Sequence, residues 1–239
     1  MEIKVINIGD RILNNYVLIC ENGCVVIDTG YEGGFGRFCE RLSLNGLSLS
    51  DISFIFLTHA HDDHAGFLGE LLNQTEAPLI LHSKAVERLM EGHNRFTGGC
   101  SSRLAQLFCR LMAIAGKGKH EFPEVDASDK AVFAELNTQI LREHGIPAKI
   151  LCLPGHTEDS IGLLLEDGRL FCGDAAMNNF PSLARHTIWI EDKESFGHSW
   201  DLIFESGAKT IYPGHGRPFP VGDLVRYRNY MDGKSLLNI

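Results

Sequence analysis

The feature that constrains this chain most is the segment HAHDDH, which begins at His59 and gathers three imidazoles and two carboxylates. It follows an apolar run, residues 52–57, that has the length and composition of a buried strand. His59 and His61 are two positions apart, so their side chains point the same way in extended backbone. Asp63 and His64 open an expected helix and can turn back toward the same point. The pattern predicts a metal site rather than a polar surface loop.

Further His and Asp residues follow expected strand ends later in the chain. His156 stands in the segment PGHT, Asp174 in CGD and His215 in PGHG. Each alone could belong to a structural turn or lie on the surface, but a rigid scaffold presents functional groups at strand ends. Seven nitrogen and oxygen donors exceed the four ligands of one zinc ion and suit two metal ions. The candidate ligands are His59, His61, Asp63, His64, His156, Asp174 and His215.

In these motifs the chain resembles the metallo-β-lactamase-fold superfamily of metal-dependent hydrolases. The resemblance also includes an opening hairpin at residues 15–19 and 25–30, and it covers nearly the whole chain. It implies an α+β fold, the αββα four-layer sandwich, in which two packed sheets are flanked by helices.

The resemblance also implies which of the candidate ligands bind each of the two metal ions. His59, His61 and His156 would hold the first metal ion, and Asp63, His64 and His215 the second. Asp174 would bridge the two ions. A hydroxide between them would be the nucleophile, because coordination lowers the pKa of a bound water. Asp63 would act as the catalytic residue that accepts or relays the proton. We expect two divalent ions, zinc first, with manganese or iron as alternatives.

Other residues are candidates for supporting roles. Asp28, Thr58 and Thr157 stand beside ligands or at a facing strand end. Metal-bound imidazoles need an acceptor for their second nitrogen, and these three residues could supply it or be ordinary turn residues. His82 and His186 are candidates for substrate contact.

Hydrophobic periodicity and turn residues predict the order of the elements. The expected strands are residues 3–8, 15–21, 24–28, 51–57, 78–82, 150–153, 161–165, 169–172 and 210–212. The expected helices are residues 38–44, 66–72, 83–90, a helix capped by Ser101 or Ser102 and ended by Gly116, and residues 194–205.

Residues 83–144 carry a different pattern, which we interpret as a helical cap insertion within a single domain, residues 1–239. Six apolar residues in this range fall at helical spacing. We expect the stripe to pack on the scaffold, with an apolar wall of a substrate pocket as the alternative. Residues 131–141 fit either a helix or pieces of strand. The stripe comprises Leu104, Leu107, Phe108, Leu111, Met112 and Ala115.

The net charge and the cysteine content limit the partners and the cellular environment that we expect for the chain. The net charge of −9 argues against nucleic acid, because phosphate contacts need clustered Lys and Arg, so we expect a small-molecule substrate. The seven cysteines form no CxxC pair, which favours a reduced, cytoplasmic environment. No signal-peptide pattern or bilayer-spanning stretch is present, so we expect no membrane partner. A homodimer is an open alternative to a monomer.

Differences from the motifs of known subfamilies limit the reactions that we expect the chain to catalyse. An aspartate bridge at Asp174 disfavours penicillin hydrolysis. The short tail after His215 disfavours glyoxalase-II-like thioesterases, and Met177 replaces the tyrosine of quorum-quenching lactonases. We therefore expect a binuclear hydrolase that cleaves a small ester, lactone, thioester or phosphoester. The alternatives are a mononuclear iron oxidoreductase that resembles persulfide dioxygenases and a metal-binding protein without catalysis.

Overall fold

The computed structural model describes residues 3–239, which form two compact units. Unit 1 comprises the described residues up to Asn94 together with residues 120–146, and unit 2 comprises residues 95–119 and 147–239. The predicted insertion at 83–144 is therefore divided between the units. That the whole chain is a single domain with a helical cap stays a prediction.

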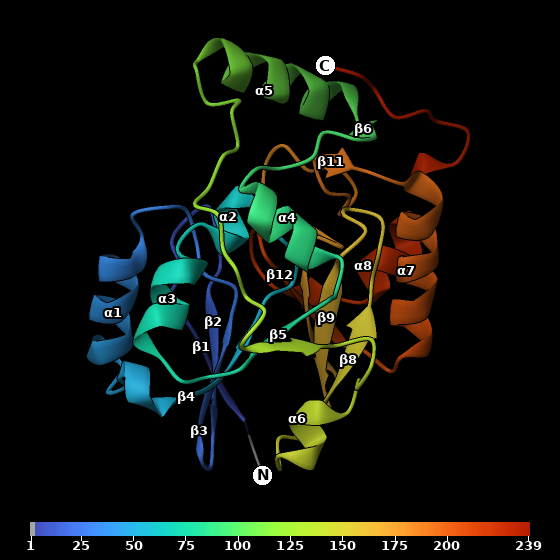
Figure 1. The fold of residues 1–239 in the computed structure, drawn as a ribbon. Coiled ribbons are helices and arrows are strands. Elements are labelled where there is room, and N and C mark those ends of the chain that lie inside the picture. Colours follow the sequence, from blue (N-terminus) through green and yellow to red (C-terminus); the bar gives the residue numbers. More distant parts are fainter. Residues whose placement is uncertain (1–2) are drawn as a thin grey trace. The chain divides into compact units, whose positions relative to one another are not determined.

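Unit 1 is built on a six-stranded sheet (Figure 1). Its first three strands are antiparallel neighbours, and the remaining pairs are parallel. The first five strands begin and end within one residue of their predicted bounds. The sixth, at residues 131–133, settles the ambiguous stretch in favour of a strand there. In sheet order the strands are β1 (Lys4–Asn7), β2 (Tyr16–Cys20), β3 (Gly23–Ile27), β4 (Ile52–Phe56), β5 (Leu79–Leu81) and β7 (Ala131–Phe133).

Helices of unit 1 lie beside this sheet, where α1 and α3 bury apolar side chains against β3 and β4 (Figure 1). Two short helices occupy this region, and the helix predicted at 66–72 is present as the second of them, displaced by two residues. The first begins at Asp62, inside the HAHDDH segment, and the second begins after Gly66. A Cβ at Gly66 would overlap the backbone of Gly30 and Glu32, so the chain can pass here only with glycine. The helices are α1 (Phe35–Leu44), α2 (Asp62–Ala65), α3 (Leu68–Gln74), α4 (Ala85–Glu91) and α6 (Ile140–Glu143).

Unit 2 is built on a five-stranded sheet and a two-stranded ribbon. In the larger sheet only β10 and β12 are parallel neighbours. Helix α7 (Lys193–Glu205) is capped by Asp192, whose Oδ1 accepts from Ser195 N at 2.7 Å, and it packs Trp200 into the core. The larger sheet has the order β13 (Phe219–Pro220), β12 (Thr210–Pro213), β10 (Arg169–Gly173), β9 (Ile161–Leu165) and β8 (Ala148–Cys152). The ribbon pairs β11 (Trp189–Ile190) with β6 (Gly99–Cys100), and α8 (Gly222–Tyr227) follows β13.

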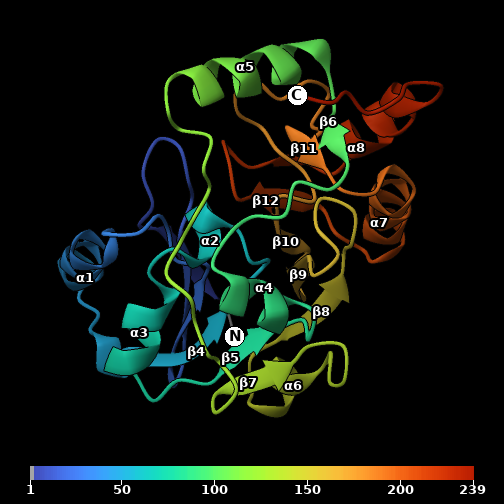
Figure 2. The ribbon, with the colours of Figure 1, turned by 45° about the horizontal axis from the view of Figure 1, so that its top comes forward.

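Helix α5 (Arg103–Ile114) also belongs to unit 2 and lies beside β6 and the C-terminal residues in both ribbon views (Figures 1 and 2). Ser102 caps it, as predicted, by accepting from Ala105 N at 3.1 Å. The expectation that its apolar stripe is packed is wrong. Ala105 is its only buried residue, and the side chains of Leu107 and Leu111 are 54% and 56% exposed. No helix within residues 3–239 is long and apolar enough to cross a membrane.

Candidate metal centre

Unit 1 brings together the four candidate ligands of the HAHDDH segment. His61 has extended backbone and occupies the N-cap position of α2, so the chain turns into the helix directly after it. The ligand atoms of His59 lie within 4.8 Å of those of His61 and His64, and those of Asp63 and His64 are equally close. The three imidazoles are buried, whereas the Asp63 side chain is 15% exposed. Four nitrogen and oxygen donors therefore converge at the carboxyl end of β4.

The carboxylate of Asp28, at the end of β3, organises this group. Its Oδ1 accepts from Thr58 N at 2.7 Å, and its Oδ2 accepts from Thr58 Oγ1 at 2.8 Å. The same Oδ2 lies 2.8 Å from Nδ1 of His64. Asp28 is 2% exposed and has a positive φ of 58°. Residues other than glycine rarely adopt this backbone conformation, so the surrounding contacts must hold Asp28 in it.

These contacts define which nitrogen each imidazole presents. His64 donates from Nδ1 to Asp28, because a buried carboxylate is an acceptor. Thr58 gives its hydroxyl proton to Asp28, so its oxygen accepts from Nδ1 of His59 at 3.0 Å. Both rings then carry the lone pair on Nε2, the atom that binds a metal ion. The expected contacts of Asp28 and Thr58 with ligand imidazoles are thus present.

Unit 2 brings together the other three candidates. His156, Asp174 and His215 follow β8, β10 and β12. Nε2 of His156 lies 3.9 Å from Oδ2 of Asp174, and Nε2 of His215 lies 3.5 Å from the same oxygen. Nδ1 of His156 donates to the carbonyl of Trp189 at 2.8 Å, which again leaves the lone pair on Nε2. The three side chains are buried.

The separations within each unit fit metal ligands. The distances from imidazole nitrogen to carboxylate oxygen are 3.5 and 3.9 Å in unit 2 and 3.8 Å between His64 and Asp63 in unit 1. These distances exceed the usual hydrogen-bond range of about 2.7–3.2 Å. Two ligands bound at about 2.0–2.2 Å to one tetrahedral ion lie roughly 3.4 Å apart. The donors are imidazoles and carboxylates, which suit zinc, manganese or iron.

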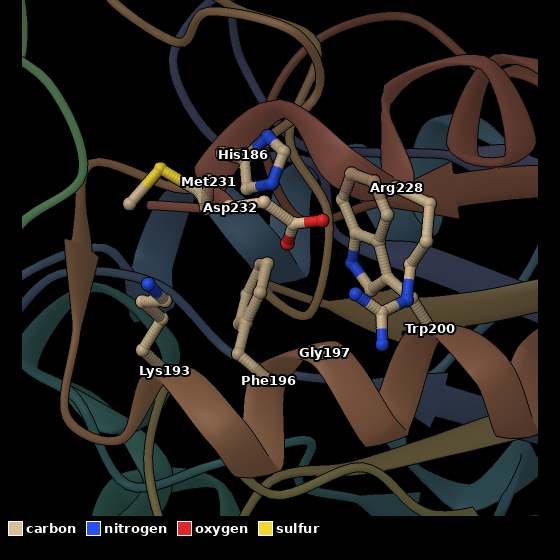
Figure 3. A pocket seen from close by; sticks show the side chains of 8 residues that line it. All are labelled: His186, Lys193, Phe196, Gly197, Trp200, Arg228, Met231 and Asp232. Atoms are coloured by element: carbon tan, nitrogen blue, oxygen red, sulfur yellow. The ribbon is translucent and has the colours of Figure 1, made fainter. Parts of the chain in front are cut away.

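Two of the predicted supporting residues have other partners. Thr157 Oγ1 lies 2.7 Å from Ser160 Oγ, so Thr157 stabilises a turn. His186 packs among Phe196, Trp200 and Tyr230 and lines a cavity of about 30 Å³ in unit 2 (Figure 3). Burial lowers the pKa of His186 to about 4, so the ring is neutral at physiological pH. We interpret His186 as a packing residue rather than a substrate contact.

A second polar network in unit 1, around Asp62, was not predicted from the sequence. Its backbone N donates to Oδ1 of Asn94 at 2.9 Å, and Nδ2 of Asn94 donates to Oδ1 of Asp62 at 2.7 Å. Nδ1 of His120 lies 3.3 Å from both carboxylate oxygens. These contacts hold the start of α2, between the candidate ligands His61 and Asp63. Asn94 and His120 are remote in sequence, and no local motif marks them.

Known proteins resemble this chain in sequence and in fold. A family model described as the metallo-beta-lactamase superfamily matches residues 9–215. Beta-lactamase-like protein 2 homolog of Drosophila melanogaster is 24% identical over 93% of this chain, which spans 65% of the fly protein. Probable metallo-hydrolase MJ0888 of Methanocaldococcus jannaschii is 26% identical over 90% of this chain and 91% of its own length.

Solved structures show the same fold. TTHA1623, solved in a di-iron-bound form, superposes with a TM-score of 0.62 at 20% identity, covering 93% of this chain and 97% of that protein. The predicted fold class, with its two main sheets and flanking helices, is confirmed. The family model covers most of the chain, and its matched range includes the positions of all seven candidate ligands: His59, His61, Asp63, His64, His156, Asp174 and His215. The chain therefore belongs to the metallo-beta-lactamase superfamily, whose members are largely metal-dependent hydrolases.

Proposed function

We propose that the protein is a binuclear metal-dependent hydrolase in which the seven candidate ligands together hold two divalent ions, most simply zinc. The observation that carries the proposal is the pair of buried ligand groups, one in each unit, whose imidazoles present Nε2 beside a carboxylate. Asp174 would bridge the two ions. Such ions lower the pKa of a bound water and polarise a carbonyl or phosphoryl oxygen.

The chain's own residues would orient the ligands and move the proton. Asp28 and Thr58 hold His64 and His59 in the metal-binding tautomer. Asp63 is the most exposed of the candidate carboxylates, at 15%, against 7% for Asp174. Greater access to solvent and substrate suits Asp63 to accept the proton of the attacking water and pass it to the leaving group.

The proposed substrates are small esters, lactones, thioesters or phosphoesters. Met177 is 4% exposed, so the position that carries tyrosine in the lactonases offers neither a hydroxyl nor an open contact. This favours the other substrate classes over lactones. None of the seven cysteines, all of which lie in the described residues, is part of a disulfide, which supports the proposal of a reduced, cytoplasmic environment.

A second candidate is an iron-dependent oxidoreductase that oxidises a thiol persulfide. It is motivated by the iron in TTHA1623, because imidazole and carboxylate ligands accept iron as well as zinc. Oxygen uptake with a persulfide substrate, and no hydrolysis, would favour this candidate.

The test is turnover of an ester, lactone, thioester and phosphodiester panel by the protein and by variants in both units. His61→Ala in unit 1 and Asp174→Ala in unit 2 are each expected to lower kcat at least a hundredfold, because either change removes a ligand of one shared centre. His198→Ala, at an exposed position on α7, is the matched control and keeps full activity. Hydrolysis that survives in either ligand variant would contradict the proposal.

A further inference from the structure

The charges of this acidic chain are unevenly distributed around α5. Residues 92–120 contain five Lys and Arg residues and no Asp or Glu. The rest of the chain therefore carries 17 of the 22 cationic residues and all 31 acidic ones. Of the five cations, Arg95 lies 3.3 Å from Glu158, an ion pair of unit 2. Arg103 and Arg110 lie on α5, and Lys117 and Lys119 follow in the loop after it.

One side of α5 combines these cations with exposed aliphatic side chains. Leu107, Leu111 and Ile114 are 54%, 56% and 84% exposed. At 100° per residue they fall on the same side of the helix as Arg103 and Arg110, and opposite the buried Ala105.

The apolar area continues beyond the helix. The ring of Phe180, which is 71% exposed, meets that of Phe108 edge-on with their centroids 6.4 Å apart. Leu183, in the same loop, is 38% exposed. Large side chains that gather at one place on the surface of a soluble protein usually mark an interaction site.

We propose that this face of unit 2, defined by Arg103, Leu107, Arg110, Leu111, Ile114 and Phe180, binds the surface of an anionic lipid membrane. A helix with aliphatic and cationic side chains on its free side lies in the plane of the interface, with its apolar side chains among the acyl chains and its cations at the headgroups. Binding at the membrane surface departs from the expectation of no membrane partner, which considered only spanning segments.

The charge pattern selects this partner over a second copy of the chain. A second copy packed face to face would bring its own Arg103 and Arg110 to the same place, and like charges at one interface repel. An anionic lipid surface, by contrast, carries negative charge along the whole length of the helix that lies on it. Each Lys or Arg near such a surface strengthens binding about fivefold, since each contributes about 1 kcal/mol.

The experiment is cosedimentation of the full chain with vesicles of phosphatidylcholine alone and of phosphatidylcholine mixed equally with phosphatidylglycerol. We expect binding to the mixed vesicles that weakens as salt is added. The double variant Arg103→Gln with Arg110→Gln should bind roughly twenty-five-fold more weakly. Leu107→Gln with Leu111→Gln should reduce binding at least about tenfold, because both leucines lose their place in the acyl region.

The matched control is Leu44→Gln with Leu136→Gln, which changes two leucines that are each 79% exposed in unit 1. This variant should bind the vesicles like the unchanged protein. Equal binding of all variants, or binding that ignores phosphatidylglycerol, would overturn the proposal. So would a dimer in sedimentation analysis without vesicles that the α5 leucine variant converts to a monomer, because that face would then be an interface between copies.

Discussion

The substitution Asp28→Asn tests how the structure supports its candidate metal ligands. Asparagine has nearly the same volume as aspartate and tolerates the positive φ of 58° at this position. The change therefore leaves the backbone in place and alters only the acceptor. The carboxylate accepts from Thr58 N, from Thr58 Oγ1 and from Nδ1 of His64 at 2.7–2.8 Å.

The size of the effect follows from these contacts. An amide has one acceptor oxygen, so its NH₂ group must face either Thr58 N or the Nδ1–H of His64, and one buried donor loses its partner. This costs about 1–3 kcal/mol of the free energy of unfolding. Loss of the carboxylate behind a ligand imidazole lowers metal affinity about 10- to 100-fold.

The assay has two parts. Urea unfolding of the metal-free protein measures the stability change, and competition with a chelator of known affinity measures the metal affinity. Asp129→Asn, at an exposed position of unit 1, is the control and should change neither quantity. Unchanged metal affinity in Asp28→Asn would refute the reasoning that this carboxylate holds His64 for a metal ion.

Three further predictions concern single positions. Thr58→Val should lower metal affinity about tenfold in the chelator competition, because the Nδ1–H of His59 loses its acceptor. Gly155→Ala should lower the thermal midpoint and the metal content together, because Gly155 has φ of 133° and a Cβ there would overlap the backbone of Phe196. Burial lowers the pKa of His186 from 6.5 to about 4, so between these pH values the unfolded chain binds more protons than the folded protein. The free energy of unfolding should therefore decrease as the pH is lowered through this range. The loss of unfolding free energy should reach at most about 3 kcal/mol. Urea unfolding at a series of pH values measures it, and the same pH dependence in His186→Phe would contradict an origin in His186.

Local patterns predicted the elements that carry the ligands. Alternation, apolar runs and glycine turns placed the first five strands within one residue of their observed bounds. The same patterns could not predict β6 and β11, which are only two residues long and exist because they pair with each other although they are remote in sequence. They also missed β13, another strand of two residues, which pairs with the preceding β12. Short pairings of this kind have no periodicity to detect.

In the site, too, local patterns predicted some features, and contacts between remote residues could not be predicted. Dense motifs at strand ends drew attention to all seven candidate ligands, and the contacts of Asp28 and Thr58 followed from their position beside them. The network of Asp62 with Asn94 and His120 was missed because it joins residues 32 and 58 positions apart. The stripe on α5 was misinterpreted because periodicity shows that a helix has an apolar side, but not what covers it.

The most direct test of the central claim is metal content per chain, measured by elemental analysis on protein purified without chelator and without an immobilised-metal column. We expect close to two divalent ions per chain, falling below two in His61→Ala and in Asp174→Ala alike. A content of one iron ion, or two ions that persist in either variant, would contradict a binuclear centre built from these ligands.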